Sequence, residues 1–195
     1  MEAPGERGIP SAYAGGGRVR WIVPIGYVAA SLLLLVPVVL YANGGDGGRL
    51  QSAAELCVLL LMVANIVQCL AMHVCKAPGR RVFSRCALLL IKLGLIPFFC
   101  MGALAVAFSA LLALHPVLFM AGLFMTPLLL ACGWLAMMGG SCWAMAYALG
   151  LRRDGLISTG ECAVHVVAQL FFVADVADGI VLFVRGRRLE GLRRV

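Results

Sequence analysis

The chain has 195 residues, of which 63% are hydrophobic and 13% are charged, and its mean hydropathy is +1.00. Soluble proteins average about 45–50% apolar and about 25% charged residues, so this composition excludes a soluble domain with a single core. The net charge of +7 does not indicate nucleic-acid binding, because fifteen of the sixteen Lys and Arg residues lie in the tails or between apolar runs. We therefore expect lipid to be the solvent of this protein.

The expected fold class is all-α, a polytopic transmembrane bundle of about five hydrophobic helices in one domain of residues 21–184. Residues 1–20 and 185–195 form basic tails that are too short and polar to fold alone. The first tail, rich in Gly, Pro, Ala and Ser, is expected to be disordered. No second folded domain is predicted.

The first apolar run, residues 21–42, contains 22 residues without a formal charge. As a helix it is about 33 Å long, enough for a hydrocarbon layer of about 30 Å. We interpret it as an uncleaved anchor, because the apolar region of a signal peptide has only about 7–15 residues. Pro37 is expected to kink it. A second helix is predicted over residues 55–75.

The third predicted helix covers residues 86–114, with a kink expected at Pro97. Residues 117–150 are too long for one simple span. We therefore expect a helix to begin at Thr126-Pro127, leaving residues 117–125 as a short interfacial or re-entrant piece.

Small residues recur at every fourth position within this fourth helix and so lie on one face. Such a ridge lets another helix approach closely. We expect this face to serve helix packing, and to be the surface for a second copy or a membrane partner. The helix-packing face comprises Ala136, Gly140, Ala144 and Ala148.

A last helix is predicted from Ser158 or Thr159, either of which can cap it, to about Val184. Its thirteen Leu, Ile, Phe and Val residues favour insertion by about 4–8 kcal/mol. Asp175 alone costs about 2.5–3.5 kcal/mol, and neighbouring polar residues bring the sum close to zero. The segment either crosses with help from other helices or lies partly in the interface.

Basic residues are distributed unevenly among the tails and loops: three, one, four, none, two and five in chain order. Five crossings with the N-terminus inside place nine of these Lys and Arg residues inside and six outside, and they leave the basic C-terminal tail on the outer side. Six crossings place 12 basic residues inside and 3 outside, and a last segment that does not cross places 14 inside and 1 outside.

Ionisable residues within apolar segments are expensive and mark candidate functional sites. The candidate intramembrane polar site comprises Lys92, Glu161, His165, Asp175 and Asp178. Lys92 either snorkels to the surface as a topology anchor or pairs with an acid on the last helix. The two aspartates, three residues apart, either bind a cation, coordinate a metal with a phosphate substrate or relay protons, or else pair with the C-terminal arginines or backbone groups. Glu161 and His165 begin a row that is either a proton path or a stripe facing solvent or the bundle.

Residues 175–179, Asp-Val-Ala-Asp-Gly, resemble the start of the CDP-alcohol phosphatidyltransferase signature, whose aspartates bind a metal and the CDP group. Leu182-Phe183 replace the Ala-Arg of that signature, and no acidic pair follows, so this enzyme is the least favoured interpretation. No other catalytic motif occurs. We therefore expect a protein that is not an enzyme, with no catalytic residue, no metal and no cofactor.

Two stretches resemble small uncharacterised membrane proteins of Gram-positive gut bacteria. They are Lys-Leu-Gly-Leu-Ile-Pro-Phe-Phe at residues 92–99 and Gln-Leu-Phe-Phe-Val-Ala-Asp-Val at residues 169–176, the latter following Gly-Leu-Ile-Ser at 155–158. The resemblance implies membrane location and about five helices, and it assigns no activity.

The expected protein is a multi-pass protein of the bacterial cytoplasmic (inner) membrane with a structural or accessory role through helix packing. Its partners would be the lipid bilayer and a second copy or a membrane protein, and no nucleic acid. The alternative is a small transporter or proton-coupled permease that uses Asp175 and Asp178 as its ion site.

Overall fold

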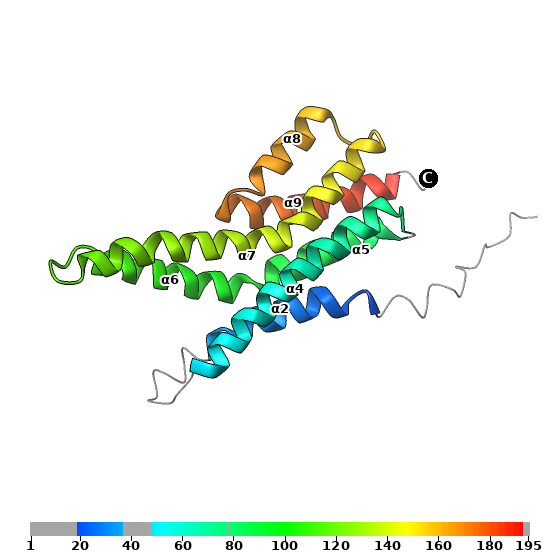
Figure 1. Ribbon diagram of the computed structural model, residues 1–195. Coiled ribbons are helices and arrows are strands. Elements are labelled where there is room, and N and C mark those ends of the chain that lie inside the picture. Colours follow the sequence, from blue (N-terminus) through cyan, green and yellow to red (C-terminus); the bar gives the residue numbers. More distant parts are fainter. Residues whose placement is uncertain (1–18, 37–47, 78, 193–195) are drawn as a thin grey trace, which may run out of the picture.

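The computed structural model describes residues 19–36, 48–77 and 79–192. Within these ranges the chain is all-α, with seven helices and no strand (Figure 1), as the composition predicted. The helices are α2 (Ile22–Leu33), α4 (Gly48–Val74), α5 (Arg80–Gly94), α6 (Ile96–Leu112), α7 (Phe119–Arg153), α8 (Thr159–Ala168) and α9 (Phe172–Leu192).

Two of these helices, α4 over Leu50–Val74 and α7, are long and apolar enough to cross a membrane. The pair α5 and α6 is bent by 41° and meets the same test when the two are taken together, which raises the count to three. Helix α2 is apolar but shorter. The structure thus supports a helical protein with two or three span-capable segments.

The first two helices differ in extent from the expectation. Helix α2 begins at Ile22, and the last six residues of the expected run, 37–42, with its kink at Pro37, lie outside the described residues. The N-terminal tail expected to be disordered also lies outside them, except for residues 19 and 20. Helix α4 begins at Gly48, seven residues before the expected start.

The expected kink at Pro97 separates α5 from α6. Helix α5 ends at Gly94, Leu95 joins the two, and α6 begins at Ile96 with Pro97 in its first turn. Proline is tolerated in a first turn because its missing N–H has no helical partner there. The third helix begins earlier than the expected residue 86, since α5 already begins at Arg80 after Gly79 in the left-handed conformation.

The prediction of a helix start at Thr126-Pro127 was wrong, because α7 runs without a break from Phe119 to Arg153. Neighbouring contacts hold the segment before Pro127 in helical form. The Thr126 hydroxyl donates to the Gly122 carbonyl at 2.8 Å and lies 2.9 Å from the Ser109 hydroxyl of α6. Gly122 lies so close to the α6 backbone that a Cβ there would overlap Ser109 and Ala113.

The prediction of one continuous last helix was also wrong. Ser158 caps α8 as expected: its hydroxyl accepts from the Glu161 N–H, and the Glu161 carboxylate accepts from the Ser158 N–H. The helix then ends at Ala168, and α9 starts at Phe172 and continues past Val184 to Leu192. The sequence gives no local signal for this break, because no Gly or Pro occurs between Glu161 and Asp178.

Helix α7 lies between the N-terminal and C-terminal helices, and polar bonds tie it to the first two. The Tyr27 hydroxyl of α2 donates to the Ala136 carbonyl at 2.5 Å. The Asn65 amide of α4 donates to the Gly139 carbonyl at 2.5 Å and accepts from the Trp143 indole at 2.9 Å. Buried polar groups need such partners, so these bonds fix the register of α2 and α4 on α7.

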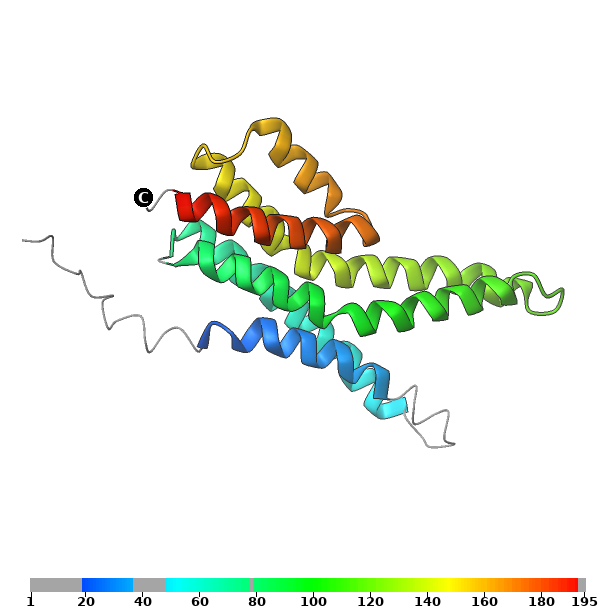
Figure 2. The same ribbon diagram turned by 180° about the vertical axis from the view of Figure 1, so that it is seen from behind.

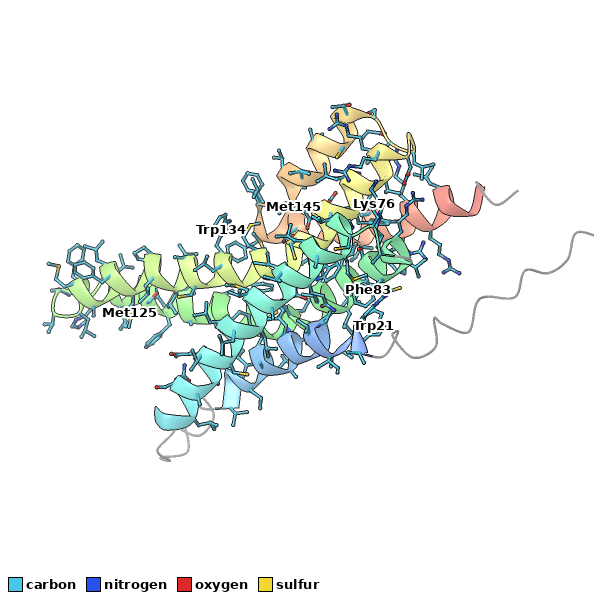
Figure 3. The ribbon with its side chains drawn as sticks, turned by 45° about the vertical axis from the view of Figure 1, so that its right-hand side comes forward. Trp21, Lys76, Phe83, Met125, Trp134 and Met145 are labelled. Atoms are coloured by element: carbon cyan, nitrogen blue, oxygen red, sulfur yellow. The ribbon has the colours of Figure 1, made fainter. Side chains whose placement is uncertain are left out.

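Several helix ends meet at one end of the bundle. Trp21 before α2 contacts Phe83 of α5, with ring centroids 4.6 Å apart, and Figure 3 shows both with Lys76 at this end and Met125 at the far end of the arm formed by α6 and α7. The Gln68 amide of α4 donates to the Arg20 carbonyl at 2.8 Å. Arg81 pairs with Asp154, which ties the start of α5 to the end of α7. We call this the basic end.

Substitution of Gly140 by leucine tests the close approach of α7 and α5. A Cβ at Gly140 would lie 2.6 Å from Ile91 Cγ2, whereas one at Gly150 on the same helix meets nothing within 4 Å. Overpacking of this kind costs about 1–3 kcal/mol. Gly140→Leu should therefore lower the thermal midpoint in detergent, while Gly150→Leu should leave it unchanged or raise it; equal midpoints would contradict the contact.

Candidate functional site

The small-residue ridge of α7 is buried within the chain. Ala136, Gly140, Ala144 and Ala148 are all buried, and Gly140 faces Ile91 of α5. Neighbouring Gly139 faces Tyr27 and Met62 in the same manner. The ridge therefore serves contacts among the helices of this chain, and these helices cover it.

Lys92 is buried between three helices and does not reach the surface. Its side chain is 2% exposed and forms an ion pair with Asp175 of α9, which is 1% exposed. Lys92 Nζ also donates to the Ser141 hydroxyl of α7 at 2.7 Å, and Ser141 Oγ lies 2.7 Å from Asp175 Oδ1. Of the two interpretations of Lys92, this geometry matches the ion pair with an acid on the last segment and not the snorkelling anchor.

A second group lies one turn further along α9. His165 Nδ1 of α8 contacts Asp178 Oδ1, and the Gln169 amide donates to Asp178 Oδ2 at 2.6 Å. His165 and Gln169 are buried and Asp178 is half-buried. This group joins α8 to α9, whereas the Lys92 group joins α9 to α5 and α7.

The two aspartates thus face different partners and do not converge on one ligand. Asp175 Oδ1 accepts from Lys92 and Ser141. The two oxygens of Asp178 are bonded to His165 of α8 and to Gln169 directly after it. Neither carboxylate bonds to Arg185, which lies on α9 itself. Among the described residues, two buried acceptor atoms of these groups have no hydrogen-bond partner: Asp175 Oδ2 and Gln169 Oε1.

Glu161 lies apart from both buried groups, near the start of α8. Its carboxylate accepts from the Ser158 N–H at 3.0 Å and from Arg185 at 2.7 Å, with both side chains well exposed. The Ser158 N–H, followed by the Arg185 guanidinium, lowers the pKa of Glu161 below its ordinary value. The five candidate residues therefore divide into two buried groups and one surface pair.

Sequence reasoning missed Ser141, which completes the Lys92 group. One signal was available, because Ser141 and Thr126 are the only hydroxyl-bearing Ser or Thr residues between positions 117 and 150. A serine beside a small-residue ridge can approach a neighbouring helix closely and bond across it.

The buried ion pair should be strongly coupled. Removal of one partner from a buried pair leaves an uncompensated charge and costs about 3–5 kcal/mol, whereas replacement of both by apolar groups is often nearly neutral. Lys92→Met and Asp175→Leu alone should each lower the thermal midpoint in detergent by many degrees, and the double variant should recover most of the loss. Arg185→Met, which breaks the exposed pair, should change the midpoint little. A double variant no better than either single one would contradict the coupling.

The Glu161 carboxylate should contribute a small, pH-dependent part of the stability. Because its pKa is lowered in the folded protein, the contribution is present above the ordinary glutamate pKa of about 4.3 and is lost as the pH falls through the lowered value. Glu161→Gln keeps an acceptor for the Ser158 N–H but removes the charge. The stability difference between wild type and this variant should shrink between about pH 5 and pH 3 in thermal scans, and a constant difference would contradict it.

Both buried groups lie within the part of the chain that matches a known protein family. The model of the family described as "Family of unknown function (DUF6652)" matches residues 19–188. No curated protein and no solved structure matched the chain significantly. The family match extends from the start of α2 into α9 and covers most of the sequence. The chain belongs to DUF6652, a family of unknown function.

Proposed function

We propose that this chain is a multi-pass protein of a bacterial cytoplasmic membrane, with a structural or accessory role exercised through helix packing. Its membrane domain corresponds to residues 21–184, flanked by basic segments. The bacterial source is inferred from the resemblance of residues 92–99 and 169–176 to small membrane proteins of Gram-positive gut bacteria.

The observation that carries this proposal is that the buried polar groups are bonded to one another. Lys92 and Asp175 form an ion pair, and His165 and Gln169 are bonded to Asp178. A catalytic or binding site would direct such groups toward a ligand, whereas here they join α5, α7, α8 and α9 to one another. Buried polar groups used in this way hold helices in one arrangement.

The outward faces of the helices favour a lipid environment. Large apolar side chains such as Leu60, Leu104, Phe108 and Phe124 are between 61% and 69% exposed. Because the ridge of α7 is covered, a second copy or a membrane partner would contact these outward faces instead. The arm formed by α6 and α7 extends furthest from the other helices (Figure 1).

Photo-crosslinking in native membranes tests the accessory role. A photo-reactive amino acid in place of Leu104, exposed on α6, should link the chain to a second copy or to one discrete membrane protein. The same group in place of buried Ile91 should give links within the chain only. A monomer linked only to lipid from Leu104 and from other outward positions would contradict the accessory role.

A specific observation favours proton-coupled transport as a second candidate. Ionisable side chains follow one another from exposed Glu161 through His165 and Asp178 to buried Asp175 and Lys92. Asp175 Oδ2 and Gln169 Oε1 have no partner among the described residues. Such a chain of groups resembles the proton relays of membrane transporters.

Proton flux into liposomes separates this candidate from the first. If the buried groups relay protons, the wild-type protein should acidify vesicles loaded with a pH-sensitive dye, and Asp175→Asn should abolish the flux. Arg185→Met, which breaks an exposed pair and removes no member of this row, should reduce it far less. Equal flux with and without Asp175→Asn, at equal protein content, would contradict transport.

A phosphatidyltransferase function has the least support. The signature needs carboxylates free to bind a metal and a nucleotide. Asp175 instead pairs with Lys92, and Asp178 contacts His165. No group of three or more metal-ligating side chains occurs in the described part of the chain.

A further inference from the structure

Helices α8 and α9 fold back on each other. Glu161 near the start of α8 pairs with Arg185 near the end of α9, and His165, one turn later, pairs with Asp178, two turns earlier. This reversed order defines an antiparallel hairpin, which Figure 1 and Figure 2 both show with its turn pointing away from the basic end. The end of α9 therefore lies beside the start of α8, at the open end of the hairpin.

The outward face of this hairpin is entirely apolar. Between Cys162 and Val184 every residue classed as exposed is Ala, Val, Leu, Ile or Phe, and Val173 reaches 86% exposure. The polar residues of the same segment, His165, Gln169 and Asp175, are buried. A helix lying at a membrane surface has the opposite requirement, a polar face toward water. This pattern fits immersion in hydrocarbon.

Both arms of the hairpin, taken up to the charged residues that flank them, are shorter than the hydrocarbon layer: residues 172–184, the part of α9 before Arg185, are about 20 Å long. Helix α8 has ten residues and is about 15 Å long, against a hydrocarbon layer of about 30 Å. The tip residue Phe172 contacts Phe99, with ring centroids 5.9 Å apart. Phe99 lies just beyond the joint at Leu95, which divides the bent α5–α6 pair into segments of 15 and 17 residues. The tip therefore lies near the middle of that pair.

The open end of the hairpin coincides with the basic end. The end of α9 lies beside the start of α5 and the end of α7 in both views (Figure 1, Figure 2). The last turn of α7 carries Arg152 and Arg153, and Arg185, Arg187 and Arg188 lie on α9 where it emerges. Clusters of Lys and Arg mark the cytoplasmic side of membrane proteins.

We propose that α8 and α9 form a re-entrant hairpin that enters the bilayer from the cytoplasmic side and returns to it. The chain then crosses four times, through the first apolar run, α4, the bent α5–α6 pair and α7, and both termini face the cytoplasm. This inference rests on the proposed multi-pass membrane location. It places fourteen Lys and Arg residues inside and one outside, with Lys92 in the membrane.

The Lys92–Asp175 pair explains how a hairpin with charged residues can remain in hydrocarbon. Non-helical backbone at membrane depth is tolerated only where its polar groups find partners within the protein, and in the turn the Leu170 and Phe171 N–H groups donate to the Val167 and Ala168 carbonyls. Asp175 lies one turn from the tip and is neutralised by Lys92 of α5, while Ser141 of α7 completes the contact. The five-crossing bundle instead carries Arg185 and the basic residues after it to the outer side, against the positive-inside rule.

Epitope tags in the full-length protein test the topology. One tag is placed after Gly155, where the backbone has open space around it, one after residue 195, and a control tag after Pro116 in the loop between α6 and α7. In spheroplasts, antibody should reach the Pro116 tag directly, and the other two only after permeabilisation. Tags at 155 and 195 on opposite sides would overturn the hairpin while leaving the multi-pass location intact.

A depth measurement separates a re-entrant hairpin from one that lies on the surface. A photo-reactive leucine analogue in place of Val173 should attach to lipid acyl chains, as detected by mass spectrometry, and the same group in place of Gly160 should attach to headgroups or water. Headgroup adducts from both positions would overturn the proposal. Extraction of the protein from membranes by alkaline carbonate would instead refute the multi-pass location itself.

Discussion

A lysine and an aspartate withdrawn from water must neutralise each other, because an isolated ion in a medium of low dielectric constant carries a large desolvation cost. Lys92 of α5 and Asp175 of α9, which are 83 residues apart in sequence, meet this requirement. Ser141 of α7 bonds to the same carboxylate oxygen, so that three helices share one contact. This contact ties α9 to both α5 and α7.

The hairpin of α8 and α9 follows from the same constraint. Once Asp175 lies beside α5, Asp178 one turn later faces α8 and takes up His165 and Gln169. A straight helix over residues 159–184 would place His165 and Asp178 nearly 20 Å apart along its axis. Reversal of the chain at residues 169–171 brings them into contact and turns the apolar side chains outward.

Helix α7 supports these contacts because its middle is made of small residues. Gly139 admits Tyr27 and Met62 on one side, and Gly140 admits Ile91 on the other. The Gly139 carbonyl also accepts from Asn65, and the Ala136 carbonyl accepts from Tyr27. In a membrane the gain from such close approach comes from van der Waals contact and hydrogen bonds, since lipid supplies no hydrophobic force between helices.

Local chemistry could be predicted from the sequence where it depends on neighbouring residues. The all-α class, the bend before Pro97 and the cap at Ser158 were predicted in this way. The continuity of α7 through Pro127 was not, because it depends on Ser109 and other parts of α6. The break at residues 169–171 was not either, because no local signal marks it.

The sequence by itself determined that the chain is rich in apolar helices, that Lys92, His165, Asp175 and Asp178 are costly where they stand, and that basic residues flank the apolar runs. Only the tertiary structure decided which acid meets Lys92, that Ser141 joins them, and that the last segment turns back. The physical reason is that burial cost can be counted along one chain segment, whereas the group that offsets the cost lies on another helix. Pairing across helices is a property of their arrangement in space, and composition and spacing do not encode it residue by residue.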